Sequence, residues 1–384
     1  MKIVRNQLTG NYFFRLFKLF PLVIGWVFSV IKEGTNNIVL VGSNRGISYS
    51  DNGRAMHEYL LKNTNFDVYW VTDKKRYDFQ TVRLGSVYCY YLYFSAKYVF
   101  YTHSNSSDIA PLVGHFPFFK QPQRVFLSHG IEGLKKRLDV KLEDADVFTC
   151  ATEEEKRIKN RYWNVPPEKL YVTGVARYDR LFDILNRREQ CLKSNTIVYL
   201  PTWREWDIAK EQSEFVKSDT YKGIVALLNS SELRDFLNKN NLTLLIKLHP
   251  FFEKFSNTFD EFQTERIKTT NDSIDNLIIK AEMLITDYSS ICWDFFYQKK
   301  PVYFYQFDIN KFNKIRGSYV SIEEIVSISN FSFDMNISYS NLEKTYKNFK
   351  LNKKLSSFLP PHDQKNCERI LLAAQESIHN DKNT

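Results

Sequence analysis

Residues 284–305, LITDYSSICWDFFYQKKPVYFY, combine the signals of a strand, a polar turn, a helix and a second strand. The apolar run Met283–Ile285 gives way to the polar run Thr286–Ser290, and a helical pattern follows. That pattern breaks at Pro301, before the β-rich run Val302–Tyr305. The stretch therefore predicts a βαβ unit, the building block of a parallel sheet.

The two serines of this turn, Ser289 and Ser290, precede the predicted helix. Hydroxyls beside the unpaired backbone N–H groups of a helix N-terminus form a cradle for phosphate. The same serines, together with Asp287, are also residue types that cap a helix without binding any ligand. Taken alone, the turn favours capping, so a phosphate site needs support from other strand ends.

Length and charge narrow the possible functions. The chain has 384 residues, which predicts two domains. Its 53 Lys and Arg against 44 Asp and Glu give a formal net charge of +9, which favours an acidic partner such as a phosphate-rich substrate or an anionic membrane. The basic residues are dispersed, which argues against nucleic acid. The five cysteines form no C-x-x-C pair, so we expect reduced thiols in a cytosolic protein.

Residues 1–33 predict an amphipathic helix that associates with a membrane. The apolar run Leu19–Ile31 follows a basic flank and is shorter than the roughly 20 residues that cross a bilayer. No small-residue cleavage site follows it, so a signal peptide is disfavoured. We expect the helix to lie on an anionic membrane surface, with aromatic side chains in the interface. A helix packed on the first domain is an equally good alternative. The aromatic residues are Phe13, Phe14, Phe17, Phe20 and Trp26.

Residues 34–185 predict a doubly wound parallel α/β domain. Short apolar runs end in small or polar residues, with helical stretches between them, and ligands of such sheets bind beyond the carboxyl ends of the strands. His103, His129 and Gly174 fall at that edge. The predicted strands are 38–41, 66–71, 98–101, 124–127, 146–149 and 170–172, and the predicted helices are 55–61 and 87–94.

His129 stands directly after a strand and before Gly130, so it is expected at the cleft, where the glycine leaves room for a substrate to approach. The ordinary pKa of histidine suits a general base near neutral pH. A histidine that only bonds the loop backbone is an equally good interpretation.

Residues 186–345 repeat the pattern, and residues 346–384 are predicted as a C-terminal helical extension. Predicted strands 197–200, 242–248 and 284–286 end in cations and hydroxyls, which suit a pyrophosphate. Arg204 or Lys247 alone would also fit a plain surface charge, but the number of such residues at strand ends makes coincidence the weaker interpretation. Two α/β domains with facing rims predict the GT-B architecture, with the nucleotide-activated donor on the C-terminal half. The residues concerned are Pro201, Thr202, Arg204, Lys247, His249, Ser289 and Ser290.

Five segments together resemble the CDP-glycerol glycerophosphotransferases, which include wall teichoic acid primases and polymerases and capsule polymer transferases. The resemblance covers nearly the whole chain. Ile131 and Glu132 depart from the pair that usually follows the His-Gly of that family. The segments are Ser128–Gly130, Thr173–Arg177, Leu200–Arg204, Lys247–Pro250, and Thr286–Ser290 with Asp294.

The resemblance implies a CDP-glycerol or other CDP-polyol donor, whose polyol-bearing phosphorus is attacked by an acceptor hydroxyl while CMP leaves. It implies His129 as the base, and His249 with Lys247 and Arg177 as groups that stabilise phosphoryl charge. Pro201 and Thr202 would line the cytidine pocket, with Gly130, Arg204, Ser289 and Ser290 also at the substrate. Asp294 would hold polyol hydroxyls or a cation. We expect no cofactor and no metal, because no carboxylate pair with metal spacing stands near these strand ends.

Three rival functions remain open from the sequence. A GT-B glycosyltransferase would break the anomeric C–O bond of a nucleotide sugar and release a nucleoside diphosphate. A nucleic-acid-binding module and a non-catalytic scaffold of polymer export are the other two. The expected location is the cytoplasmic face of the cell membrane, as a peripheral protein with a lipid-linked or polymeric glycan acceptor. Glycerol or ribitol and the oligomeric state stay undecided.

Overall fold

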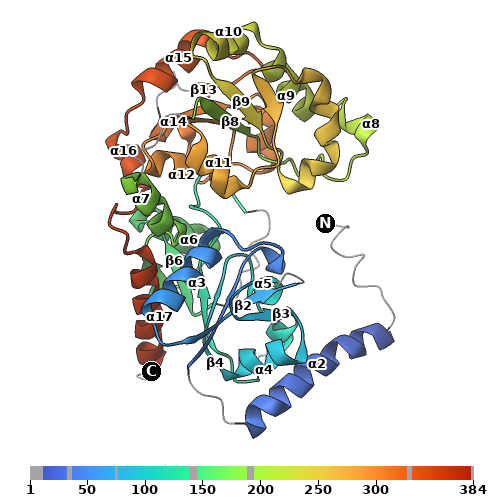
Figure 1. Cartoon of the computed structure of the whole chain (residues 1–384), viewed down its shortest axis with the longest axis vertical. Helices are drawn as coiled ribbons and strands as arrows, with labels where there is room; N and C mark the ends of the chain where they lie inside the picture. Colours follow the sequence, from blue (N-terminus) through green and yellow to red (C-terminus); the bar gives the residue numbers. More distant parts are fainter. Residues whose placement is uncertain are drawn as a thin grey trace.

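The computed structural model of the chain describes residues 12–32, 37–73, 77–116, 118–137, 145–187, 194–326 and 331–381. The described residues form two parallel β-sheets, one from each half of the chain, with helices around both (Figure 1). The prediction of an α/β fold with parallel sheets is confirmed. The assignment of residues to separate domains stays a prediction, and α7 (Arg177–Arg187) crosses the boundary predicted at residue 185.

The first sheet has seven strands in the order β3-β2-β1-β4-β5-β6-β7, and every pair is parallel. This is the doubly wound order, in which the chain starts at the centre and builds outward in both directions. The strands are β1 (Ile38–Gly42), β2 (Asp67–Thr72), β3 (Thr81–Arg83), β4 (Ala96–Tyr101), β5 (Gln123–Phe126), β6 (Val147–Cys150) and β7 (Leu170–Val172).

The second sheet has the order β10-β9-β8-β11-β12-β13, again with parallel pairs throughout. Counted from β8, this is the same doubly wound order. The strands are β8 (Thr196–Leu200), β9 (Thr243–Ile246), β10 (Ile267–Thr269), β11 (Met283–Thr286), β12 (Val302–Tyr305) and β13 (Phe331–Ser332).

Helices connect the strands in both halves. In the first half they are α2 (Tyr12–Ile31), α3 (Asp51–Asn63), α4 (Val87–Ser95), α5 (Asn105–Asp108), α6 (Glu153–Trp163) and α7. The helices that follow the first half are α8 (Gln212–Phe215), α9 (Asp219–Asn229), α10 (Ser231–Lys239), α11 (Ile274–Lys280), α12 (Cys292–Tyr297), α13 (Ile309–Ile315), α14 (Ile322–Ile325), α15 (Tyr339–Asn348), α16 (Lys353–Ser356) and α17 (Asn366–Asp381). Short 3-10 helices are η2 (Asn44–Gly46), η3 (Val113–His115), η4 (Pro167–Lys169) and η6 (Pro250–Phe262).

The central strands of the second sheet are apolar on both faces because both faces are covered. In β8, Val198 and Leu200 belong to one hydrophobic core, whereas Ile197 and Tyr199 belong to the core on the opposite face. All four residues of β11 are buried. The continuous apolar runs of the sequence are therefore strands between two cores, and their polar ends emerge at the rim.

The C-terminal helix α17 returns to the first sheet and runs beside it (Figure 1). Its Cys367, Ile370 and Ala374 join the core that contains Val125 and Val147 of β5 and β6. The last part of the chain thus ties back to the half in which the chain begins.

Helix α2 packs along α4 on the outer side of the first half (Figure 1). Leu22 is buried there, and a Cβ at Gly25 would lie 2.5 Å from the Tyr90 Cβ, so the helices approach closely. The Trp26 ring lies 4.7 Å from that of Phe119. Packing on the first half, one of the two alternatives for this helix, is therefore present. Residues 1–11 and the side chains of Phe13, Phe14 and Phe17 lie outside the described residues.

Candidate active site

Each sheet reverses its strand order at one place, between β1 and β4 in the first and between β8 and β11 in the second. Loops diverge at such a switch point and leave a crevice for ligands. In the first sheet, the hydroxyls of Ser43 and Thr102 lie 2.9 Å apart and join the two loops. In the second, the Thr202 N–H donates to Asp287 Oδ1 at 2.8 Å. The predicted site residues follow these strands and their neighbours.

The loop after β5 touches the loop after β11, which belongs to the other sheet. A Cβ added at Gly130 would lie 2.7 Å from Ser290 Oγ and 3.2 Å from Ser290 Cβ, so the two loops approach closely at this glycine. The structure therefore brings the predicted His129–Gly130 and Ser289–Ser290 pairs together. This contact between the halves is the central geometric feature of the candidate site.

The backbone before His129 is held in an unusual conformation. Ser128 has φ 56°, in the left-handed region that costs energy for a residue with a side chain. The buried Lys159 ammonium donates to Ser128 Oγ at 3.0 Å and also pairs with Glu155 at 3.1 Å. Asn52 Nδ2 donates to the Ser128 carbonyl at 2.9 Å. These contacts from α3 and α6 fix the direction in which His129 leaves the strand.

The His129 side chain is accessible to solvent, although protein groups from both halves surround it. Partial withdrawal from water, reinforced by facing cations, holds the pKa of His129 well below its usual value of 6.5. The ring is therefore neutral at neutral pH and can accept a proton. The facing cations are His103, Lys135, Arg137 and Arg177.

His249 precedes η6 and caps it. Its Nδ1 accepts a hydrogen bond from the Phe251 N–H at 3.2 Å, so the neutral ring carries its proton on Nε2. Burial, with a further contribution from the charge of Lys135, lowers the pKa of His249 to about 4. In this neutral tautomer His249 can donate a hydrogen bond to a phosphoryl oxygen.

Lys135 is a candidate site residue that the motif-based prediction missed. Its charge acts on both His129 and His249, so the ammonium lies where the two halves face each other. Burial and the charge of Arg316 lower its pKa. Among the described residues, no carboxylate forms an ion pair with it. The signal in the sequence was the basic run Lys135–Arg137 soon after His129.

Lys135 is held by contacts between the backbones of the two halves. The Lys136 N–H donates to the Gly317 carbonyl at 2.9 Å, and the Tyr319 N–H donates to the Gly133 carbonyl at 2.8 Å. Three carboxylates act on Lys135. Glu205 pairs with Arg316 and Asp287 with Arg204 at 2.8 Å, whereas burial raises the pKa of the third, Glu132, to about 7. The Lys135 ammonium therefore sits in a fixed frame in which an anionic substrate would be its counterion.

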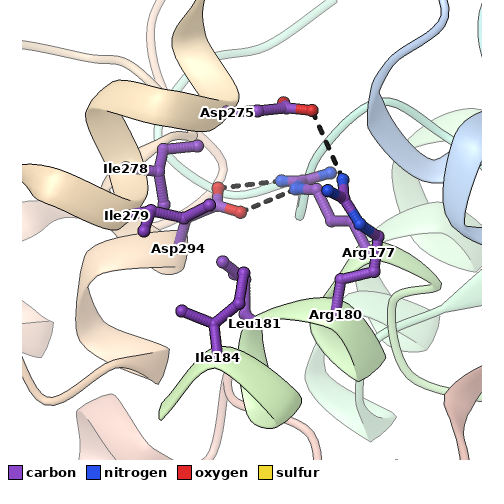
Figure 2. Close-up of a pocket in the computed structure, with 8 residues that line it drawn as sticks. All are labelled: Arg177, Arg180, Leu181, Ile184, Asp275, Ile278, Ile279 and Asp294. Carbon is purple, nitrogen blue, oxygen red and sulfur yellow. Dashed lines mark hydrogen bonds and ion pairs between the residues drawn. The ribbon is translucent and has the colours of Figure 1, made fainter. Parts of the chain in front are cut away.

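Arg177 joins the two halves, and Figure 2 shows its contact with Asp294. Its guanidinium makes a bidentate contact to Asp294 at 2.6 and 2.8 Å and donates to Asp51 at 3.0 Å. Arg180 pairs with Asp275 at 3.6 Å across the same pocket. In this conformation Arg177 and Asp294 neutralise each other, so the expected contacts of Arg177 to phosphate and of Asp294 to polyol or a cation are not available to a substrate.

Arg204 is fully buried and bound by protein groups. Its guanidinium donates to both oxygens of Asp308, at 2.7 and 2.9 Å, and pairs with Asp287 at 2.8 Å. Because these contacts and its burial leave the guanidinium no exposed surface toward the site, its contacts hold together the loops that follow β8 and β11. The expectation of direct substrate contact by Arg204 does not fit this geometry.

The other predicted residues of the second half lie at the rim. Pro201 and Thr202 are buried beside the switch point, and Thr202 Oγ1 has no hydrogen-bond partner among the described residues. Lys247 and the serine pair are half-buried. Asp287 does not cap α12, since its carboxylate accepts from the Thr202 and Tyr288 N–H groups. Within the described residues, no group of three His, Cys, Asp or Glu gathers as a metal site.

Comparison with known proteins identifies the family. The sequence profile described as CDP-Glycerol:Poly(glycerophosphate) glycerophosphotransferase matches residues 26–373. The chain belongs to this family. The resemblance inferred from the five segments is thereby confirmed.

The relatives in this glycerophosphotransferase family act in teichoic acid synthesis. The chain is 26% identical to the minor teichoic acid biosynthesis protein GgaB of Bacillus subtilis, over 86% of this chain and 39% of that protein. It is 25% identical to a teichoic acid glycerol-phosphate transferase of Staphylococcus aureus, over 80% of this chain and 84% of the relative. The chain thus spans well under half the length of GgaB and most of the second relative.

A solved structure of the wall teichoic acid polymerase TagF has the same fold. It superposes with a TM-score of 0.67 at 19% identity, covering 94% of this chain and 98% of that one. A further TagF structure, with a TM-score of 0.63, was obtained after a soak with CDPG. The likeness places both sheets and their connections in the GT-B-like arrangement of TagF.

Proposed function

We propose that this glycerophosphotransferase family member transfers glycerol phosphate from CDP-glycerol to a hydroxyl of a growing cell-surface polymer and releases CMP. The observation that carries the proposal is the contact of the Gly130 loop with Ser290 across the two sheets, in a chain whose sequence fits the family over 26–373. The relatives named above support the substrate class, since one is a glycerol-phosphate transferase.

The reaction balances with the residues at the rim. The acceptor oxygen bonds to the glycerol-bearing phosphorus, the bond from that phosphorus to the oxygen of CMP breaks, and CMP departs with the electron pair. The proton of the hydroxyl passes to the ring of His129, which is neutral at the start. Lys135, Lys247 and the His249 N–H offset the charge on the phosphoryl oxygens, while Ser289 and Ser290 donate hydrogen bonds. Transfer without a metal stays part of the proposal.

The test is a donor screen with the purified chain and a polymer primer. CDP-glycerol, CDP-ribitol and UDP-sugars are supplied separately, and the released nucleotide is separated by chromatography. We expect CMP from CDP-glycerol, and a loss of at least a hundredfold in kcat in His129→Ala. Release of UDP from a UDP-sugar, without CMP from either CDP-polyol, would replace this proposal with a glycosyltransferase.

We further propose that α2 rests on the cytoplasmic face of the cell membrane, where a lipid-linked acceptor would be reached. Its face away from α4 leaves apolar side chains exposed, an arrangement that suits a helix lying in the interface. Among the described residues, no helix is long and apolar enough to cross a bilayer. The exposed side chains are Phe20, Val23, Val27, Phe28, Val30 and Ile31.

A further inference from the structure

His103 and His129 form a stacked pair at the edge of the first sheet. Their rings lie parallel, 8° apart in orientation, with centroids separated by 5.1 Å. The stack follows from the register of β4 and β5, in which Tyr101 lies opposite Phe126, so the residues after the two strands emerge side by side. Nothing in the family resemblance assigned a role to His103.

The His103 ring is fixed by a buried carboxylate. Its Nδ1 lies 2.9 Å from Thr102 Oγ1 and 3.6 Å from Asp108 Oδ2. Asp108 is fully buried and accepts the backbone N–H groups of Thr102, His103 and Arg45, at 3.1, 2.8 and 3.0 Å. The carboxylate therefore cannot turn away, and its negative charge favours a proton on His103.

The His129 ring has no comparable anchor of its own. Among the described residues, neither of its ring nitrogens has a hydrogen-bond partner, and its aromatic contact is the stack on His103. A general base works when its ring is both oriented and unprotonated. His103 contributes to both requirements, because its ring lies flat against that of His129 and its charge adds to burial and to the other cations in disfavouring protonation of His129.

We propose that His103 is a positioning residue, which holds the His129 ring flat against its own and, as an imidazolium, keeps His129 in the neutral form that accepts a proton. This inference rests on the proposed function, in which His129 is the base. The stack links that base to the first switch point through Thr102, whose hydroxyl also contacts Ser43 at 2.9 Å. An acceptor bound at this crevice would lie beside the base.

The charged groups around His103 and His129 shift the two pKa values in the directions that this role requires. Asp108 raises the pKa of His103 despite its partial burial, so His103 becomes charged first as the pH falls. Burial and the neighbouring cations lower the pKa of His129, so it stays neutral to more acidic pH. The groups facing His103 are Asp108, Asp51 and Arg45, and those facing His129 are His103, Lys135, Arg137 and Arg177.

The test compares His103→Phe, which keeps a stacking ring without charge, with His103→Lys, which keeps a positive charge without an aromatic ring. Histidine-labelled full-length protein is titrated by NMR, and the His129 signal is assigned by its loss in His129→Gln. Two unit charges 5.1 Å apart with water-like screening predict a rise of about half a pH unit for His129 in His103→Phe. In His103→Lys the midpoint stays at or below that of the unchanged protein.

The acidic limb of kcat against pH is measured with CDP-glycerol in parallel, and we expect it to move upward in His103→Phe alone. Equal His129 midpoints in all three proteins, or an equal rise in both variants, would overturn the inference. The NMR readout does not depend on turnover. A normal rate in His129→Ala with the expected NMR shifts would therefore reject His129 as the base while leaving the coupling of the two histidines in place.

Discussion

Lys135 is a half-buried cation between two catalytic candidates. Its positive charge acts on His129 and on His249, which follow strands of different sheets. Of the carboxylates that act on it, Glu205 and Asp287 are paired with Arg316 and Arg204, and burial raises the pKa of Glu132 to about 7. An ammonium without its own ion pair costs stability unless a ligand supplies the countercharge. We therefore expect it to bind the diphosphate of the donor.

Replacing Lys135 by methionine should raise the KM for the CDP-glycerol donor by about 10- to 100-fold, because a charge-assisted hydrogen bond is worth roughly 1.5–3 kcal/mol. Initial-rate kinetics over a range of donor concentrations measure the effect. Lys136→Met is the matched control, since the Lys136 side chain is exposed, and we expect less than a twofold change. Equal KM values in both variants would remove Lys135 from the donor site.

Residue type and position along the chain placed His129, His249 and the serine pair after strand ends, and the structure has them there. Residue type and position did not reveal that Arg204 is buried against Asp308 and Asp287, because those partners lie far away in the sequence. The same holds for Arg177, whose carboxylates come from other elements. A basic residue after a strand indicates the rim of the sheet, but only the packing decides whether it faces a ligand or a carboxylate.

Among the elements, helix α2 has two different faces. Leu22 and Gly25 pack toward α4, whereas Val23 and Val27 are 46% and 40% exposed. Exposed valines contribute little to folding, and burying each in a lipid interface stabilises binding by up to about 1.5 kcal/mol. The exposed face is therefore available for the membrane contact proposed above.

The double substitution Val23→Asp with Val27→Asp should reduce co-sedimentation with phosphatidylglycerol vesicles by on the order of tenfold or more, because two apolar contacts are lost and two negative charges meet an anionic surface. Thermal denaturation checks that the fold is kept. Leu61→Asp, at an exposed apolar position on α3, is the control and should leave vesicle binding unchanged. Unchanged binding of the double variant would reject α2 as the membrane contact.

The central strands were predictable because each is an apolar run between polar turns. The strands predicted at 38–41 and 302–305 correspond to β1 and β12 almost residue for residue. The short edge strands β3, β10 and β13 were missed, since runs of two or three residues carry no periodic signal. The return of α17 to the first sheet was also missed, because an amphipathic helix does not specify which apolar surface it covers.

At the scale of the whole molecule, the two halves are joined across the site by the ion pair of Arg177 and Asp294. Both side chains are largely withdrawn from water, at 11% and 1% exposure, and their contact is bidentate. Under the proposed function, the donor and the polymer would bind between the same halves. We therefore expect the pair to contribute to holding the two halves together.

Asp294→Asn keeps the shape of the side chain but leaves Arg177 with Asp51 as its remaining carboxylate. Removing one partner of a buried pair costs about 3–5 kcal/mol, so we expect a loss of that order in the free energy of unfolding by urea. Small-angle scattering should report a larger radius of gyration for the variant. Asp275→Asn is the control, because its contact to Arg180 is longer, at 3.6 Å, and more exposed, and such pairs contribute about 1 kcal/mol or less. Similar losses in the two variants, with unchanged scattering, would mean that Arg177 and Asp294 do not hold the halves together.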